Sequence, residues 1–279
     1  MAAAAVVLLL GAAAVAVIVA APHRLGMTYS EATDGARPDG AGRPGGIAEQ
    51  TMTAPLAGRQ TGTFVLADGL SSFDLRVADL GDDLYRISSP AGSGVAARPA
   101  VLGETVRLGL VETGASGARA VRVLLNEQVG WRLRLVGGVS SQVLDLTRAR
   151  LLGVELAGGS ARTEIFLPPI SAVSEGSAAS KGSAASKGSA ASPTRGSTGI
   201  MTVRLTGGTS QLDVRVPGET PVRVRVGAGA GSLVVRDERW DRVAAGAVLG
   251  TPGWDRAAER VYLDLVAGAN SVTVSSSTR

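Results

Sequence analysis

The sequence offers few side chains that could catalyse a reaction. It contains no cysteine and a single histidine, His23. Disulfides, thiolate metal sites and cysteine nucleophiles are therefore excluded. A histidine-based triad, a histidine metal site and a histidine general base each lack their usual residue. We expect no catalytic residue, no bound metal and no cofactor.

Four carboxylates, Asp145, Glu155, Glu164 and Asp213, are the candidates for acid and base chemistry such as glycoside cleavage. That reaction needs two carboxyl groups a few ångströms apart, one of them in a less polar setting. Each candidate alternates with apolar residues, a position typical of solvated side chains that also discourage edge-to-edge strand pairing. The pattern favours a protein that is not an enzyme, with an envelope polysaccharide hydrolase as the alternative.

Paired glycines recur as Gly137-Gly138, Gly158-Gly159 and Gly207-Gly208. They have neither the Walker spacing with Lys and Ser/Thr nor a G-x-G-x-x-G ahead of a helix. The Asp that a calcium-binding nonapeptide needs after its glycines is also missing. We therefore predict bends, in which glycine lets the chain turn tightly or adopt a positive φ.

Arginine is the side chain most able to bind a ligand. The net charge is +4, and the chain is basic almost entirely through arginine, since its only lysines are Lys181 and Lys187. Outward-facing arginines on stacked strands could form a basic stripe that attracts anionic wall polymers or lipid headgroups. The alternative is an ordinary solvated face, or the arginine bias of a GC-rich genome. The candidate residues are Arg132, Arg134, Arg162, Arg204, Arg215, Arg223 and Arg225.

Short strands must position these side chains. Between Trp131 and Leu135 apolar residues alternate with arginines, which is the period of a half-buried strand. The glycine pairs at 137–138 and 158–159 are 21 residues apart, a spacing typical of a repeat architecture. Alternation begins at Thr61, so the region from there should join the same sheet. The predicted strands lie at 63–66, 72–77, 83–87, 105–110, 120–125, 131–135, 143–146, 154–156, 163–167, 201–205, 212–216, 221–226, 233–235, 261–265 and 271–274.

Two stretches carry a resemblance to a known family: Leu156 to Pro168, and Leu205 to Pro217. Each contains a Gly-Gly bend and a strand that closes at proline. Together with the units from about Val121 to Val274, they look like the bacterial toast-rack domains, which include surface adhesins and the C-terminal domain of LiaF-type cell-wall stress proteins. The resemblance implies a β-solenoid and an extracytoplasmic location, and it implies no chemistry.

The expected fold class is therefore all-β. We predict a right-handed, β-helix-like solenoid of short strands with Gly-rich bends, preceded by one N-terminal transmembrane helix. A β-sandwich is the alternative.

The segment from Ala2 to Ala21 has twenty residues without a charged or polar side chain. As a helix it would span about 30 Å, the thickness of a bilayer core. We predict an uncleaved anchor at residues 1–24. The alternatives are a signal peptide, whose usual basic segment is missing here, and a misassigned start codon that removes a cytoplasmic portion.

Two further stretches lack a hydrophobic period. Residues 25–60 are rich in Gly, Pro and isolated charges, and we expect a flexible linker. The tandem repeat of Gly-Ser-Ala-Ala-Ser-Lys within 171–199 should form a low-complexity insertion between two layers. The β-solenoid domain then covers 61–279.

Only 3% of the residues are aromatic, which leaves little for stacking on bases and makes nucleic acid an unexpected partner. The leading hypothesis is a single-pass cell-membrane protein without catalytic activity. Its extracytoplasmic β domain would present a surface to an envelope protein or an anionic wall polymer, in adhesion or envelope stress. A secreted structural protein is a further alternative.

Overall fold

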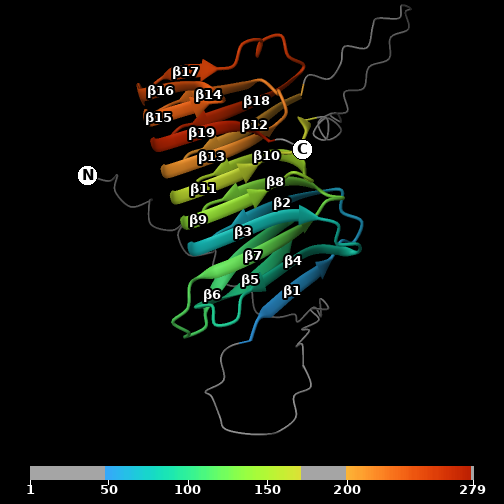
Figure 1. The fold of residues 1–279 in the computed structure, drawn as a ribbon. Helices are drawn as coiled ribbons and strands as arrows, with labels where there is room; N and C mark the ends of the chain where they lie inside the picture. Colours follow the sequence, from blue (N-terminus) through green and yellow to red (C-terminus); the bar gives the residue numbers. More distant parts are fainter. Residues whose placement is uncertain (1–47, 171–198, 278–279) are drawn as a thin grey trace, which may run out of the picture.

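The computed structural model describes residues 48–170 and 199–277. These residues form nineteen β-strands in two sheets and no α-helix, which confirms the all-β prediction (Figure 1). The predicted membrane helix, most of the predicted linker and nearly all of the predicted insertion lie outside the described residues.

Ten strands form the first sheet, sheet A. In their order across the sheet they are β1 (Gln50–Pro55), β4 (Asp83–Ser89), β7 (Ala120–Asn126), β3 (Leu70–Ala78), β9 (Val139–Asp145), β11 (Ser160–Phe166), β13 (Thr209–Pro217), β19 (Ala269–Ser277), β15 (Ala230–Val235) and β16 (Glu238–Val243).

Nine strands form the second sheet, sheet B. In order they are β17 (Ala247–Gly250), β14 (Val222–Val226), β18 (Glu259–Leu265), β12 (Gly199–Leu205), β10 (Arg150–Leu156), β8 (Gly130–Leu135), β2 (Thr61–Leu66), β6 (Thr105–Glu112) and β5 (Val95–Leu102).

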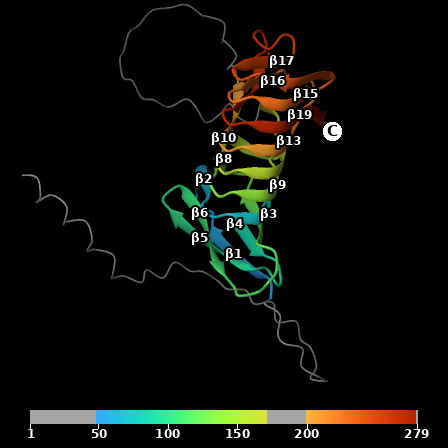
Figure 2. The same cartoon turned by 90° about the vertical axis from the view of Figure 1, so that its left-hand side faces the viewer.

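Seven strands of each sheet pair in parallel and stack along one axis (Figures 1 and 2). In each layer a strand of sheet B is followed along the chain by a strand of sheet A. The layers are β6/β7, β2/β3, β8/β9, β10/β11, β12/β13, β18/β19 and β14/β15. Because consecutive strands alternate between the sheets, the molecule is a stack of two-stranded coils, unlike an antiparallel sandwich.

The layers do not follow the order of the sequence at either end of the stack. The β2/β3 layer lies between β6/β7 and β8/β9, and the β18/β19 layer lies between β12/β13 and β14/β15. At the N-terminal end the inner layer β2/β3 comes first and β6/β7 is added outside it, whereas at the C-terminal end the outer layer β14/β15 comes first and β18/β19 is inserted inside it. A sequence repeat does not predict this order, because the strands of exchanged layers have the same apolar period.

Antiparallel strands cover both ends of the stack. β1, β4 and β5 lie at the N-terminal end, and β16 and β17 at the C-terminal end. The strand β1 falls inside the predicted linker, so the folded domain begins before residue 61. Its residues Met52 and Ala54 oppose Ile87 and Tyr85 of β4, and this pairing orders a segment that has little hydrophobic signal of its own.

One hydrophobic core fills the space between the sheets. Leu156, Val214 and Val224 are at most 2% exposed, as the alternation predicts. Trp131 is fully buried because its partner across the strands is Gly62, where a Cβ atom would lie 2.7 Å from the indole. Its Nε1 donates a hydrogen bond to the Asn126 carbonyl at 2.8 Å.

Two buried polar side chains interrupt this core. Gln142 and Thr163 point inward from neighbouring strands β9 and β11, and the Gln142 Nε2 donates to the Thr163 Oγ1 at 2.8 Å. The Ser160 and Thr163 hydroxyl groups are also hydrogen-bonded to each other, at 2.8 Å. A strict apolar alternation would place aliphatic residues at both positions, so these two depart from the sequence pattern.

The two edges where the sheets meet are built differently. On the glycine edge, sheet B strands lead to sheet A strands through six bends of three residues, each ending in glycine. They cover 67–69, 136–138, 157–159, 206–208, 227–229 and 266–268. On the variable edge the connections range from the three residues between β7 and β8 to the long segment between β11 and β12.

Backbone packing explains the glycine pairs. A Cβ atom at Gly158 would lie 2.2 Å from the Gly137 carbonyl oxygen, and one at Gly207 would lie 2.4 Å from that of Gly158. A positive φ occurs on this edge at Gly229, with φ 97°, and not at the three pairs. The first glycine of each pair therefore serves close stacking of layers, and positive φ is the wrong explanation for the pairs.

Candidate functional site

The outer face of sheet B carries a row of alternating charges. Strand register places Arg134, Glu155, Arg204, Asp264 and Arg225 side by side on β8, β10, β12, β18 and β14. Asp264 lies 3.6 Å from Arg204 and 2.9 Å from Arg225, and Glu155 lies 3.5 Å from Arg134. In the C-terminal half of this face, Arg204 and Arg225 thus share the Asp264 carboxylate.

The N-terminal part of the same face is different. Arg98, Arg107, Arg132 and Arg134 project from β5, β6 and β8 and are all exposed; we call them the basic quadrant. Arg107 and Arg134 flank Val65 of β2, so their Cα atoms are about 10 Å apart. Among the described residues, the pair Arg134–Glu155 is the ion pair that this group makes.

The seven predicted arginines do not form one stripe. Five lie on sheet B, whereas Arg162 and Arg215 lie on the opposite outer face, on β11 and β13. Arg162 is 2.6 Å from Glu164, and the Arg215 guanidinium stacks 4.9 Å from the Phe166 ring. Arg162 and Arg215 therefore each have a partner within sheet A.

Arg223 has a structural partner that the sequence did not reveal. The loop between β17 and β18 places the Trp254 ring between two guanidinium groups, those of Arg223 at 3.9 Å and Arg260 at 4.5 Å. Asp255 pairs with Arg223 at 2.9 Å, and Trp254 donates to the Val261 carbonyl at 3.1 Å. This cluster fastens the loop onto sheet B through cation–π contacts.

Arg98 and Arg107 were missing from the predicted set. Arg107 lies in Thr-Val-Arg-Leu, an alternation as regular as that around Arg132, so the same pattern could have identified it. Arg98 lies in β5, an edge strand interrupted by Pro99, and its sequence carries no such signal.

The four candidate carboxylates lie on the outer faces, with Glu155 on sheet B and the others on sheet A. Register places Glu164 and Asp213 side by side on β11 and β13, where Arg162 pairs with Glu164 at 2.6 Å. The Asp145 carboxylate accepts a hydrogen bond from Thr147 at 2.7 Å, and Asp213 accepts one from Gln211 at 2.8 Å. No pair of them shares a less polar enclosure of the kind that acid catalysis requires.

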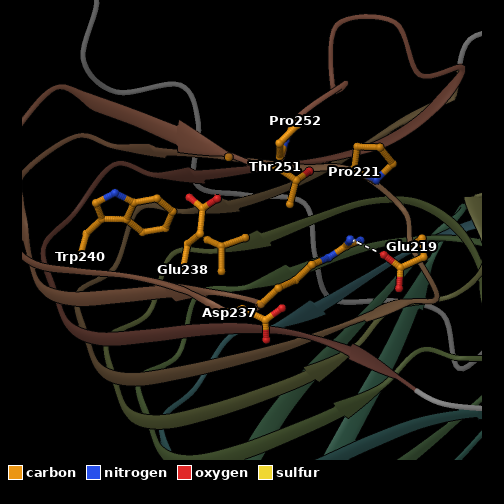
Figure 3. Close-up of a pocket in the computed structure, with 10 residues that line it drawn as sticks. Glu219, Pro221, Asp237, Glu238, Trp240, Thr251 and Pro252 are labelled. Atoms are coloured by element: carbon orange, nitrogen blue, oxygen red, sulfur yellow. Dashed lines mark hydrogen bonds and ion pairs between the residues drawn. The ribbon is translucent and has the colours of Figure 1, made fainter.

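A cleft of about 200 Å³ opens at the C-terminal end of the stack (Figure 3). The carboxylates of Glu219, Asp237 and Glu238 line it together with the Trp240 indole. Glu219 is paired with Arg236, and the Thr251 hydroxyl contacts the β14 backbone, accepting from the Val222 N–H at 2.9 Å. The Thr251 hydroxyl therefore has a structural partner in the β14 backbone.

The described part of the chain offers neither a cluster of metal ligands nor a membrane-spanning helix. Within 48–170 and 199–277, no three His, Cys, Asp or Glu side chains are grouped so that they could hold a metal ion. No helix in those two ranges has the length and apolar character of a membrane span.

No protein-family model and no curated protein matches the sequence. Among solved structures, the chain is similar to a candidate cell adhesion protein of Clostridium sporogenes, with 12% identity over 82% of this chain and 99% of that one, at a TM-score of 0.49. It is also similar to a candidate adhesin of Parabacteroides merdae, with 10% identity over 61% of this chain and 62% of that one, at a TM-score of 0.22. At these values the similarities establish no family.

Proposed function

We propose that the chain is a membrane-anchored, non-catalytic protein of the bacterial cell envelope. Its stack would be a β-solenoid of the toast-rack type, right-handed as parallel crossovers almost always are. The basic quadrant would bind an anionic polymer of the cell wall. The observation that carries this proposal is the group of four exposed arginines with one carboxylate beside them.

Electrostatics favour this face over the rest of the surface. Arginine presents a planar fork of N–H donors that matches phosphate and carboxylate groups. In the C-terminal half of the same face, Asp264 accepts a hydrogen bond from Arg225 at 2.9 Å and pairs with Arg204 at 3.6 Å. A polyanion therefore gains more at the quadrant, where the guanidinium groups remain available.

The experiment measures how the full-length chain in detergent binds purified wall polymer as NaCl increases. Charge reversal at Arg107 and Arg132 should weaken binding at least tenfold and reduce its salt dependence, since about two contacts with anionic groups are lost. The matched control reverses Arg162 and Arg215 on sheet A, with the same change in net charge. Equal losses in both variants would mean that net charge, and not the quadrant, determines binding.

Anchoring and orientation need a separate test. The chain has no cysteine, so single-cysteine variants can be labelled with a membrane-impermeant reagent without background. An extracytoplasmic domain predicts that a cysteine at the exposed position of Ser140 is labelled in intact cells. Labelling only near the N-terminus would reverse the orientation, and a mature N-terminus after residue 21 would indicate secretion.

A further inference from the structure

A second arginine cluster lies in a shallow groove on the outer face of sheet A. The groove has a volume of about 420 Å³ and lies across β1, β4, β7 and β3, near the N-terminal end of the stack. Register places Arg86 of β4 and Arg76 of β3 on either side of Leu124 in β7. Arg122, two residues before Leu124, lies opposite Ser88. Three guanidinium groups therefore surround one aliphatic side chain.

The three arginines differ in how much of their hydrogen bonding is already used. Arg76 is held by both carboxylate oxygens of Asp74, at 2.9 and 3.1 Å, and this hydrogen bonding raises the pKa of its guanidinium. Arg86 reaches Asp83 at 3.4 Å. Arg122 makes no ion pair with any residue that the structure describes. Arg122 and part of Arg86 are thus free to bind a ligand.

The charges that line the groove limit what it can bind. Asp83, which pairs with Arg86, lies outside the lining. Within the lining, Asp74 and Glu49 oppose the three arginines and leave one net positive charge. One negative charge on a ligand neutralises it, whereas a second would be repelled by Glu49. The hydroxyl groups of Ser88 and Thr51, which neighbour each other across β4 and β1, add hydrogen-bond donors.

We propose that this groove binds a singly charged oxyanion ester, a phosphodiester or a sulfate ester, with Arg122 and Arg86 as its main donors. Arginine forms its strongest hydrogen bonds with such oxygens. The groove lies on the opposite face from the basic quadrant, so the proposal does not depend on the proposed function.

The test uses the full-length chain in detergent and three probes: dimethyl phosphate, methyl sulfate and methyl phosphate at pH 8, where the last is doubly charged. Titration calorimetry or NMR shifts should show tighter binding of the two monoanions. Arg122→Gln should weaken monoanion binding about tenfold. The matched control, Arg256→Gln, removes the same charge from an exposed position in the loop between β17 and β18 and should leave binding unchanged.

Two results would overturn the proposal: equal weakening in Arg122→Gln and Arg256→Gln, or no saturable binding of either monoanion. Glu49→Gln gives an independent check, since it should strengthen methyl phosphate binding most and reduce the preference for monoanions. Because Arg122 is exposed and unpaired among the described residues, its substitution should not disturb folding. Soluble glycerol phosphate polymer and phosphatidylglycerol vesicles, compared in wild type and Arg122→Gln, then distinguish a wall source of the phosphodiester from a lipid source.

Discussion

The glycine edge and the variable edge join the same strands through different connections. On the glycine edge, five hydrogen bonds run from layer to layer, each from the N–H after one bend to the glycine carbonyl of the next, at 2.9 to 3.3 Å. On the variable edge, Asn126 satisfies backbone groups of an individual turn, donating to the Gly81 and Asp83 carbonyls at 2.9 and 2.7 Å. Backbone bonds also join layers on the variable edge, as from the Leu146 N–H to the Phe166 carbonyl at 2.9 Å. The two edges therefore differ in their connections, which are uniform three-residue bends on the glycine edge and vary in length on the other.

This difference explains where the chain can vary. A change in one bend of the glycine edge shifts the layers on both sides, because their backbones are in contact. The connections of the variable edge already differ in length from layer to layer, so a change of length there is more easily accommodated. The predicted insertion, the cleft of Figure 3 and the Trp254 loop all occur on that second edge.

The largest expected effect comes from placing a methyl group on the glycine edge. Gly158→Ala puts a Cβ atom 2.2 Å from the Gly137 carbonyl oxygen and 2.8 Å from that of Val136. Because both obstacles are backbone, the layers must separate, and we expect a loss of roughly 2–4 kcal/mol in the free energy of unfolding. Chemical denaturation of the two proteins measures this.

Gly81→Ala is the matched control on the variable edge. Gly81 has φ 56° and nothing within 4 Å of the position that the new methyl group would take, so only backbone strain opposes the substitution. The expected loss is about 1 kcal/mol. If Gly81→Ala costs more than Gly158→Ala, close contact between layers does not explain the glycine pairs. Ala267 shows how the stack accommodates a methyl group, since its hydrogen bond to Leu205 in the adjacent layer is lengthened to 3.4 Å.

The same contrast explains how much could be predicted from the sequence. Strands that pack between two neighbours have apolar residues on a strict alternation, and all fifteen predicted strands are present. The four strands that were missed, β1, β5, β16 and β17, are the outermost strands of the two sheets. Each has a neighbour on one side alone and carries proline, glycine or charge, as in Glu-Arg-Trp-Asp-Arg of β16, which discourages pairing with another molecule.

The candidate site was harder to predict than the fold. Alternation correctly placed Arg132, Arg134 and Arg204 on an outer face, but it does not say which strands become neighbours. The pairing of Arg204 and Arg225 with Asp264 depends on the exchanged order of β14 and β18. Local sequence therefore predicts exposure, whereas the order of layers decides which charges remain unpaired.

Shortening the predicted insertion tests how tolerant the variable edge is. Four residues suffice to connect β9 and β10 across the same edge, so a four-residue linker should replace 171–198. Each halving of a flexible loop recovers about 0.6 kcal/mol of closure entropy, which predicts a gain of about 1–2 kcal/mol. Denaturant unfolding measures the gain, and a marked loss of stability would show that the segment contributes packing to the fold.

The smallest expected effect concerns the Trp254 loop. A hydrogen bond from the Arg223 guanidinium lowers the pKa of the Asp255 carboxyl below its ordinary value of 3.8. A carboxyl group whose pKa is lowered in the folded state stabilises the fold at every pH above its pKa in the unfolded state. This contribution is lost as the pH falls through its pKa in the folded state. The melting temperature of wild type should thus slightly exceed that of Asp255→Asn near neutral pH, and the difference should disappear in acid below the folded pKa. A difference that persists there would assign the effect to loop packing, since the Trp254 contacts with Arg223 and Arg260 do not require the Asp255 charge.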